Sequence, residues 1–565
     1  MHELSEPDVL VVGAGPTGLA LACDLARHGV VCRVVERASA PVSRRGTAEL
    51  LPRTQEVLES FGALAPLEER AQALRSMNLY GHSGARRLAR LEYAQLDTPF
   101  PRVLGVAPAT VAATLRARAC EIGARVDFGV ELASLELGDG DEPTRARLRH
   151  ADGRDETARA RWVVGCDGAT SVVRAAIDVP FEARSEAERY WFADVDLDWE
   201  MPEDDQYVFL GERGFVMIAS LPGERRALIT LENPPPDEEP SLERLQELLC
   251  RRVPIRGELS APRWLAHERV RPRLAARFRV GPVFLAGDAA HVHSPLGGHG
   301  LNAGVQDVHN LAWKLGLVRR GLARPALLDS YDEERRRASL HISRGDPERT
   351  SRALRLRGSI ARGLRDALTP VLANIETINR RVARAFSELE FTYRESSLVE
   401  EHHTPLLGAR LTHSDRSEQA SLADRREFAL APAAGDRVPH ARVTTDAGDE
   451  RSLFDLTRGT FHTLLLFDGD APTPEGYRNL AEIGKAIRDQ YGDLVRTHVV
   501  IPAAEAPATL PWEGAVILDH DGALHRRFGA RAECQYLIRP DRHVAFRSQP
   551  ADRHVLVEYL KRVLI

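Results

Sequence analysis

Two glycine-rich segments of the chain carry residue types that could bind a nucleotide and stabilise a negative charge. In the first, GAGPTG, the glycines Gly13, Gly15 and Gly18 have the spacing G-x-G-x-x-G, and Glu36 follows 18 residues after the last of them. Such glycines permit a tight turn and let a pyrophosphate approach the amides at a helix N-terminus. A carboxylate at Glu36 can accept hydrogen bonds from ribose hydroxyls and disfavours a 2′-phosphate, so we expect FAD or NAD here rather than NADP.

The second segment, GPVFLAGDAAHVHSPLGGHGLN, combines a carboxylate with a glycine loop and one histidine in its middle, His299. Its apolar run at 283–286 predicts a strand that delivers Asp288 to its carboxyl end, where ligands bind in open α/β sheets. Free amides and the positive dipole end of the helix that follows suit a group that becomes anionic. A glycine-rich surface loop with a capped helix is the alternative, but it does not explain why the loop directly follows a strand.

The elements that position the first motif follow from the apolar pattern. The run at 9–12 suits a strand buried on both faces, and apolar residues at helical spacing over 19–25 predict the helix after it. Because a second apolar strand ends at Glu36, the segment 9–36 is expected to form a βαβ unit.

Later segments predict a second sheet, a helical stretch and a further domain. Residues 189–199, 206–223 and 225–232 show partial alternation, as antiparallel strands with one face available to a ligand do. From about 324 to 398 the composition is typical of helices, and over 462–547 strands and a helix alternate as in a separate small α/β domain. Five side chains of the second sheet are candidates for substrate contacts, although each also suits an ordinary core position: Tyr190, Tyr207, Phe209, Phe215 and Met217.

Length and composition limit the classes of protein. A chain of 565 residues exceeds the size of one core, so two or three domains are expected, and a net charge of -6 argues against nucleic acid as a partner. The first residues lack the basic and apolar regions of a signal peptide, and no apolar run reaches the ~18 residues of a membrane span, so a cytoplasmic protein without a membrane partner is expected. The six cysteines form no C-x-x-C and no cluster with histidine at metal-ligand spacing, so we expect reduced, mostly buried thiols and no metal site.

Three motifs, in this order along the chain, resemble those of one known family. They are GAGPTG with Glu36, VVGCDGATSVVR at 163–174 and GDAAHVHSPLGGHGLNAGVQD at 287–307. With them, the chain from Asp8 to about Tyr331 resembles the FAD-dependent aromatic hydroxylases, single-component flavoprotein monooxygenases of the para-hydroxybenzoate hydroxylase and phenol hydroxylase type. Two further stretches, GDRVP and LIRPDRHVAFR, are similar to the C-terminal thioredoxin-like domain of the phenol hydroxylase branch, which lacks a redox cysteine pair as this chain does.

The resemblance implies an α/β fold class with four parts. Residues 1–180 and 266–330 would form a discontinuous Rossmann-like FAD-binding domain, and residues 181–265 an inserted antiparallel-sheet domain that binds the substrate. A helical segment at 331–400 would precede a thioredoxin-like α/β domain at 401–565 without redox cysteines.

The family's cofactor-binding positions can be carried over to this chain residue by residue. By resemblance, Gly298 and the residues after it present backbone to the flavin pyrimidine, Pro295 lies beside the reactive carbon, and Arg45 lies near the mobile positions of the flavin. Asp167 matches a motif linked with FAD and NAD(P)H, although it could simply cap a helix. The catalytic candidates are Arg45, Pro295 and His299. The implied FAD-binding set is Gly13, Gly15, Pro16, Thr17, Gly18, Glu36, Arg37, Arg45, Arg116, Asp167, Asp288, Pro295, Gly298, His299, Gly300, Leu301 and Asn302.

The activity that the resemblance implies is that of a monooxygenase using FAD, NADPH or NADH, and O2. NAD(P)H would reduce the flavin, oxygen would add to give a flavin C4a-hydroperoxide, and a dry pocket would hold a phenolic or polycyclic, polyketide-like aromatic ring against it. The expected partners are a small aromatic substrate and O2, and the protein is expected to be a monomer or a homodimer. Baeyer-Villiger oxygen insertion on the same scaffold and a non-catalytic flavin-bound interaction protein are the alternatives.

The chain departs from the family pattern on the helix that begins at Pro108. Ala109 stands where the family has a glutamine that contacts the flavin chain, and Ala113 stands near the position of an acid. One flavin hydrogen bond, worth about 1 kcal/mol, is therefore expected to be missing or to be supplied by Arg116 or Arg118.

The glycine loop also differs, since His299 and Leu301 stand where the family commonly has glutamine and methionine. An imidazole with a pKa of about 6.5 could act on substrate protonation or on flavin electronics. It could also replace the glutamine as a plain hydrogen-bond donor, which we expect because either side chain can donate one N–H. His291 and His293 lie nearby but lack a third ligand at fixed spacing, so they do not predict a metal site.

Overall fold

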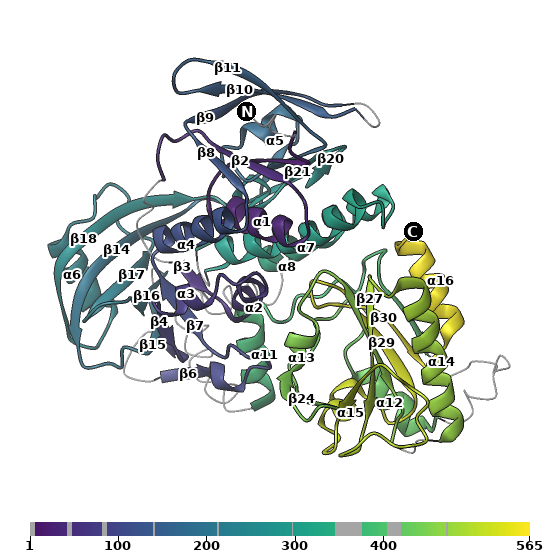
Figure 1. The fold of residues 1–565 in the computed structure, drawn as a ribbon. Coiled ribbons are helices and arrows are strands. Elements are labelled where there is room, and N and C mark those ends of the chain that lie inside the picture. The colour runs from purple at the N-terminus through teal and green to yellow at the C-terminus, as the bar shows by residue number, and fades with distance from the viewer. Residues whose placement is uncertain are drawn as a thin grey trace. The chain divides into compact units, whose positions relative to one another are not determined.

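The computed structural model divides into two compact units (Figure 1). The first comprises Met1–Ala312 and Arg335–Leu389, and the second comprises Trp313–Glu334 and Glu390–Ile565. In the part of the chain that the structure describes, no helix is long and apolar enough to cross a membrane. The described residues are 6–41, 48–81, 87–138, 142–211, 214–295, 298–344, 376–403, 420–470 and 473–565.

A six-stranded sheet in the first unit has the order β20-β21-β12-β1-β2-β8. The short apolar strand β1 is buried along its whole length, pairs in parallel with β2 and β12, and is joined to β2 by α1. The predicted βαβ unit is therefore confirmed, because a parallel neighbour requires a crossover and α1 supplies it. The bounds are β1 Val9–Val12, α1 Pro16–Arg27, β2 Cys32–Glu36, β8 Arg125–Phe128, β12 Trp162–Gly165, β20 Arg279–Val280 and β21 Val283–Leu285.

A seven-stranded sheet in the same unit has the order β18-β14-β17-β16-β15-β5-β6. The predicted strands over 189–232 pair antiparallel, and β5 and β6, which the sequence pattern did not predict, extend the sheet from β15. On one face, Ile218 belongs to an apolar cluster that includes Leu245 of α6, and on the other, Met217 belongs to a cluster that includes Phe386 of α11. The bounds are β5 Ser76–Tyr80, β6 Arg87–Glu92, β14 Glu188–Trp199, β15 Asp205–Gly211, β16 Gly214–Ser220, β17 Arg226–Glu232, α6 Leu242–Arg252, β18 Gly257–Val270 and α11 Glu376–Phe386.

Three short sheets, β3-β7-β4, β11-β10-β9 and β13-β19-β22, complete the strands of the first unit. Their bounds are β3 Ala48–Leu50, β4 Gln72–Leu74, β7 Val103–Val106, β9 Val130–Glu136, β10 Thr144–His150, β11 Asp155–Ala160, β13 Phe181–Ala183, β19 Arg273–Ala275 and β22 His291–Val292. The remaining helices are α2 Pro52–Ser60, α3 Ala65–Glu68, η1 Tyr93–Gln95, α4 Pro108–Glu121, α5 Val172–Ala176 and η2 Gly287–Ala289. Two longer helices, α7 His299–Arg319 and α8 Asp329–Arg344, contribute residues to both units.

An eight-stranded mixed sheet in the order β23-β30-β29-β26-β27-β28-β24-β25 forms the core of the second unit, drawn in green to yellow in Figure 1. The predicted alternation of strands with a helix is confirmed, and the only cysteine of this unit, Cys534, is buried and unpaired. The bounds are η3 Pro325–Leu328, β23 Glu400–His403, α12 Leu422–Leu430, β24 Arg442–Thr445, β25 Glu450–Ser452, α13 Leu453–Leu456, β26 His462–Phe467, α14 Pro474–Tyr491, β27 Val495–Ile501, β28 Ala515–Leu518, α15 Ala523–Phe528, β29 Cys534–Ile538, β30 Val544–Gln549 and α16 Arg553–Val563.

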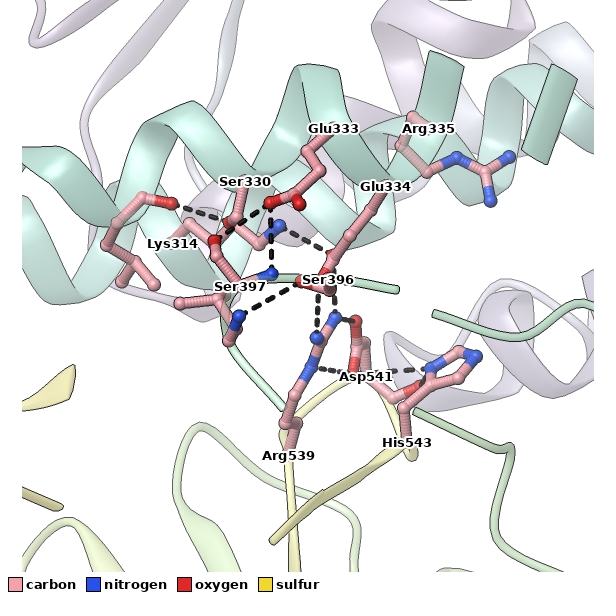
Figure 2. Close-up of polar contacts among 12 residues, drawn as sticks. Lys314, Ser330, Glu333, Glu334, Arg335, Ser396, Ser397, Arg539, Asp541 and His543 are labelled. Carbon is pink, nitrogen blue, oxygen red and sulfur yellow. Dashed lines mark hydrogen bonds and ion pairs between the residues drawn. The ribbon is translucent and has the colours of Figure 1, made fainter. Parts of the chain in front are cut away.

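A buried cluster of charges, centred on Glu334 of α8, lies inside the second unit (Figure 2). Arg539 donates to both carboxylate oxygens of Glu334, at 2.6 and 3.0 Å, and Lys314 Nζ donates to Oε2 at 2.8 Å. Ser396 Oγ adds a bond of 2.7 Å, and Asp541 accepts from Arg539 at 2.5 Å. Although burial by itself raises the pKa of Glu334, the charges of Arg539 and Lys314 outweigh it and hold that pKa well below its usual range.

Replacing Glu334 by glutamine should therefore destabilise the protein by about 3–5 kcal/mol, because it leaves Arg539 and Lys314 buried with one negative charge fewer. Denaturant unfolding of the full chain measures the loss. The matched control is Glu333→Gln, which removes the neighbouring carboxylate that accepts from Ser397 at the surface and should cost less than about 1 kcal/mol. Equal losses in the two variants would contradict the role given to Glu334.

Candidate active site

The first glycine motif is shaped by close backbone contacts. A Cβ on Gly13, whose φ is +106°, would lie 2.4 Å from the carbonyl oxygen of Cys166, and a Cβ on Gly18 would lie 2.0 Å from that of Gly13. At Gly15 the same atom would meet nothing within 4 Å, so this position faces open space at the start of α1. No side chain caps α1, and its first residue is Pro16. The free amides and the open side at Gly15 fit the pyrophosphate of FAD.

Two carboxylates, at the ends of the two strands that flank β1, accept hydrogen bonds from backbone amides beside this motif. Glu36 Oε2 accepts from the amide of Ala14 at 2.9 Å, and its Oε1 accepts from that of Ala38 at 3.0 Å. Asp167 Oδ2 accepts from the amides of Val172 and Val173, at 2.7 and 3.1 Å, and so caps α5. Asp167 therefore has the structural role that the sequence left open, while its Oδ1 is buried without a hydrogen-bond partner among the described residues. The next residue after Glu36, Arg37, is exposed.

The second glycine motif meets the first through Thr17. A Cβ on Gly287 would lie 2.7 Å from Thr17 Oγ1, and one on Gly304 of α7 would lie 2.5 Å from the same atom. Bare backbone at both positions thus lets α1 approach α7. A Cβ on Gly300 would lie 4.0 Å from Asp288 Oδ1, which places this carboxylate beside the first turn of α7.

The buried amide of Asn302 joins the glycine loop to strand β3. Its Oδ1 accepts from the amide of Leu51 at 3.0 Å, and its Nδ2 donates to the carbonyl oxygens of Glu49 and Gly298 at 2.6 and 2.7 Å. A Cβ on Gly298 would stand 3.0 Å from Glu49 Oε2. The structure therefore adds Glu49 to the site, a residue that the sequence motifs did not single out. Pro295 accepts at its carbonyl from the amide of Gly298, at 3.1 Å, and closes the turn.

His299, the first residue of α7, is buried and bonded to a carboxylate from a distant part of the chain. Its Nδ1 donates to Glu388 Oε1 at 2.7 Å, and Gln306 Nε2 donates to the other oxygen of the same carboxylate. The hydrogen-bond partner of the imidazole therefore lies 89 residues further along the chain. No local pattern could have indicated Glu388, whereas the sequence did single out His299. Leu301, two residues after His299, is half-buried on the same turn.

A buried ion pair of Asp307 lies next to the glycine loop. Asp307 Oδ2 accepts from His291 Nε2 at 2.6 Å and from the amide of Gly287 at 3.0 Å, and its Oδ1 accepts from Arg335 at 2.8 Å. Burial alone raises the pKa of Asp307, but His291 and Arg335 outweigh it and hold that pKa well below its usual range. The described residues contain no group of histidine, cysteine or acidic side chains that could hold a metal ion.

The five substrate candidates lie on two opposite faces of the seven-stranded sheet. Tyr190, Phe215 and Met217 share one apolar cluster, whereas Tyr207 and Phe209 belong to the cluster on the opposite face, which α6 covers. The first face also reaches the glycine loop. Tyr190 Oη lies 3.1 Å from Ser294 Oγ, and both hydroxyls bond to Glu188.

Two arginine candidates fall outside this arrangement. Arg45 lies outside the described residues, as does the rest of the segment 42–47. Two residues of the glycine loop, Leu296 and Gly297, lie outside them as well. Arg116 of α4 stacks over the ring of Phe128, with 5.9 Å from its guanidinium carbon to the ring centre. The alternative donor on the same helix, Arg118, donates to the carbonyl oxygen of Phe61 at 2.9 Å.

Replacing His299 by glutamine should keep FAD content and stability close to those of the wild type, because an amide can also donate to Glu388. His299→Leu removes the donor from a buried carboxylate and should lower the free energy of unfolding by about 1–3 kcal/mol. Flavin content after purification and denaturant unfolding measure both variants. If the glutamine variant were as unstable as the leucine variant, hydrogen bonding to Glu388 would not be the structural role of His299.

Comparison with known proteins places this site in a family. A family model described as an FAD binding domain matches residues 6–345, and one described as aromatic-ring hydroxylase, C-terminal, matches residues 431–564. Pentachlorophenol 4-monooxygenase of Sphingobium chlorophenolicum is 31% identical, over 99% of this chain and 96% of that protein. 6-Methylpretetramide 4-monooxygenase of Streptomyces rimosus is 32% identical, over 99% of this chain and 94% of that protein.

A solved structure shows the same fold over the whole chain. The ternary complex of aklavinone-11 hydroxylase with FAD and aklavinone superposes with a TM-score of 0.73 at 27% identity, and covers 100% of this chain and 99% of that one. The glycine motifs, the uncapped start of α1 and the order of the domains agree with these matches. The chain therefore belongs to the family of FAD-dependent aromatic-ring monooxygenases, as its motifs predicted.

Proposed function

We propose that this enzyme uses FAD, NAD(P)H and O2 to hydroxylate a phenolic or polycyclic aromatic substrate. One observation carries the proposal. The glycine loop that begins α7 meets one apolar face of the seven-stranded sheet, through Ser294 at Tyr190 and through Gly298 at Glu49, which is bonded to Gln206. A cofactor held by the loop would therefore face a wall of aromatic and apolar side chains with few polar groups, as small-molecule sites do.

The residues that would hold FAD come from both glycine motifs. The amides of α1 beyond Gly15 would bind the pyrophosphate, Glu36 the ribose of the adenosine half and Asp288 the ribityl chain. The amides at the first turn of α7, around Gly300, would face the flavin ring, and the positive end of the helix dipole there stabilises negative charge. When bound, FAD accepts electrons from NAD(P)H and activates O2 for transfer to the ring.

The protein's own contribution is to position the substrate and to exclude water. Phe215, Met217 and Tyr190 are 5% exposed or less and lie on the face nearest the loop, so they would form the dry wall of the pocket. Relatives are named for pentachlorophenol and 6-methylpretetramide, and a structural neighbour binds aklavinone. These names support an aromatic substrate class for this enzyme, and hydroxylation rather than oxygen insertion into a ketone.

The test is turnover by the purified holoenzyme. We expect a yellow protein that oxidises NADPH or NADH faster when a phenol such as pentachlorophenol or a polycyclic hydroxyquinone is present, and a product that carries one oxygen atom from labelled O2 as a hydroxyl. A colourless protein, or NAD(P)H oxidation that no aromatic compound changes, would contradict the proposal. A ring-expanded ester product would indicate Baeyer-Villiger oxidation instead.

A variant links this activity to the proposed cofactor site. Gly15→Val places a branched side chain at the start of α1, where the pyrophosphate would bind and where a Cβ would meet nothing within 4 Å. The apoprotein should unfold at the wild-type temperature, while FAD affinity should fall at least about tenfold because the phosphate can no longer approach the amides. Unchanged FAD affinity would place the cofactor elsewhere.

A further inference from the structure

Glu49 on strand β3 is a buried acid whose carboxyl is held at one oxygen only. The residue is 6% exposed, and its Oε1 accepts from Gln206 Nε2 at 2.7 Å. Gln206 is itself held, because its Oε1 accepts from the hydroxyl of Tyr93 at 2.7 Å. Burial raises the pKa of Tyr93 above its usual range, so this hydroxyl stays a donor. The chain of bonds fixes which end of the Gln206 amide faces the acid.

The other oxygen, Glu49 Oε2, is turned toward the glycine loop. It lies 3.0 Å from the position of a Cβ on Gly298, so a side chain at residue 298 would crowd it. Among the described residues, the hydrogen bond made by the carboxyl of Glu49 is the one at Oε1, from Gln206. A carboxylate oxygen can accept more than one hydrogen bond, so Oε2 is able to accept one from a ligand that supplies an O–H.

Gln206 places this acid on the apolar face that the proposed function gives to the substrate. Residues 206, 208 and 210 of β15 alternate with Tyr207 and Phe209, and Val208 and Leu210 belong to the cluster that contains Phe215, Met217 and Tyr190. Gln206 therefore points to the same side of the sheet as these aromatic and apolar side chains. The free oxygen of Glu49 lies where that face and the glycine loop meet.

We propose that Glu49, positioned by Gln206, binds the phenolic hydroxyl of the substrate through Oε2 and takes up its proton. The inference rests on the proposed function and adds a catalytic residue to it. In this step the O–H bond of the phenol breaks, a bond between the proton and Oε2 forms, and the electron pair stays on the phenolic oxygen. That pair makes the ring more electron-rich, as electrophilic oxygen transfer requires, and return of the proton to the phenolic oxygen restores the carboxylate of Glu49.

The electrostatic surroundings of Glu49 suit a proton acceptor for a phenol. Burial raises the pKa of Glu49, while the bond from Gln206 and the charge of His299 lower it in part. The raised pKa of Glu49 lies closer to the pKa of a phenol, which reduces the free energy needed to move the proton between them. The titratable groups that face it are His299 of α7 and Tyr93 of η1, and Asp205 of β15 acts on Tyr93.

The experiment measures binding of 4-nitrophenol to the oxidised holoenzyme, without NAD(P)H, as a function of pH. At alkaline pH, free Glu49 and the free phenol are both ionised, whereas the complex holds one proton that the two groups share. This proton has to be taken up when the phenol binds. In the wild type we expect uptake of close to one proton per phenol bound, and an affinity that falls up to about tenfold per pH unit there. Calorimetry in two buffers of different ionisation enthalpy counts the protons.

Glu49→Gln keeps an oxygen that can accept from Gln206 and an amide that can donate to a phenolate. Proton uptake should vanish in this variant, and its affinity at alkaline pH should equal or exceed that of the wild type. Its stability should not fall, because an acid whose pKa is raised on folding destabilises the folded state once it ionises, and glutamine does not ionise. The methyl ether, 4-nitroanisole, should bind both proteins without proton uptake.

The matched control is Asp194→Asn. This buried carboxyl lies on β14 of the seven-stranded sheet that carries Gln206, is paired with Arg226, and is separated from β15 by β17 and β16. The variant should keep the proton uptake of the wild type. Equal proton uptake in the wild type and in Glu49→Gln, or no saturable binding of 4-nitrophenol to the wild type, would overturn the role of Glu49. Turnover with normal uptake in Glu49→Gln would refute only this inference, whereas proton uptake without any NAD(P)H-dependent hydroxylation would refute only the proposed function.

Discussion

The candidate site depends on how closely separate backbone segments approach one another at the first turn of α7. Thr17 of α1 touches Gly287 and Gly304, and Glu49 of β3 touches Gly298. A Cβ on Gly287 or Gly304 would come within 2.7 Å of Thr17, and one on Gly298 would crowd Glu49, so α1, β3 and α7 could not meet as they do without shifting. The glycines of the loop are therefore needed for packing as well as for ligand binding, because both require another group to approach the backbone closely.

Buried charges hold this contact in one arrangement. Asp307 is compensated by His291 and Arg335, and Glu388 by His299, so each carboxylate that burial penalises has a donor fixed by the fold. Such fixed dipoles and charges do not need to reorganise when charge develops nearby, which is the condition for electrostatic stabilisation of a reacting group. Glu49 differs from the others, because only one of its oxygens has a described partner. A functional group is expected where compensation is incomplete.

Much of the fold could be predicted from apolar patterns and glycine spacing. The strand at 9–12, the helix after it and the strand that ends at Glu36 follow from local periodicity, and all three are present. The face of the second sheet that meets the loop could not be predicted. Its strands carry apolar residues on both sides, so a pattern of period two does not show that Phe215 faces the loop and Phe209 faces α6.

By itself the sequence determined the βαβ unit that opens the chain, because turn geometry, helix periodicity and strand burial depend on residues that are close together in the chain. The family and its FAD followed from the resemblance of three local motifs to those of known proteins. Only the tertiary structure decided which side chains meet around the loop. Gln206 and Glu49 are 157 residues apart, and His299 and Glu388 are 89 apart. Such pairs form when whole elements pack, and packing depends on every contact of the unit at once rather than on any local pattern.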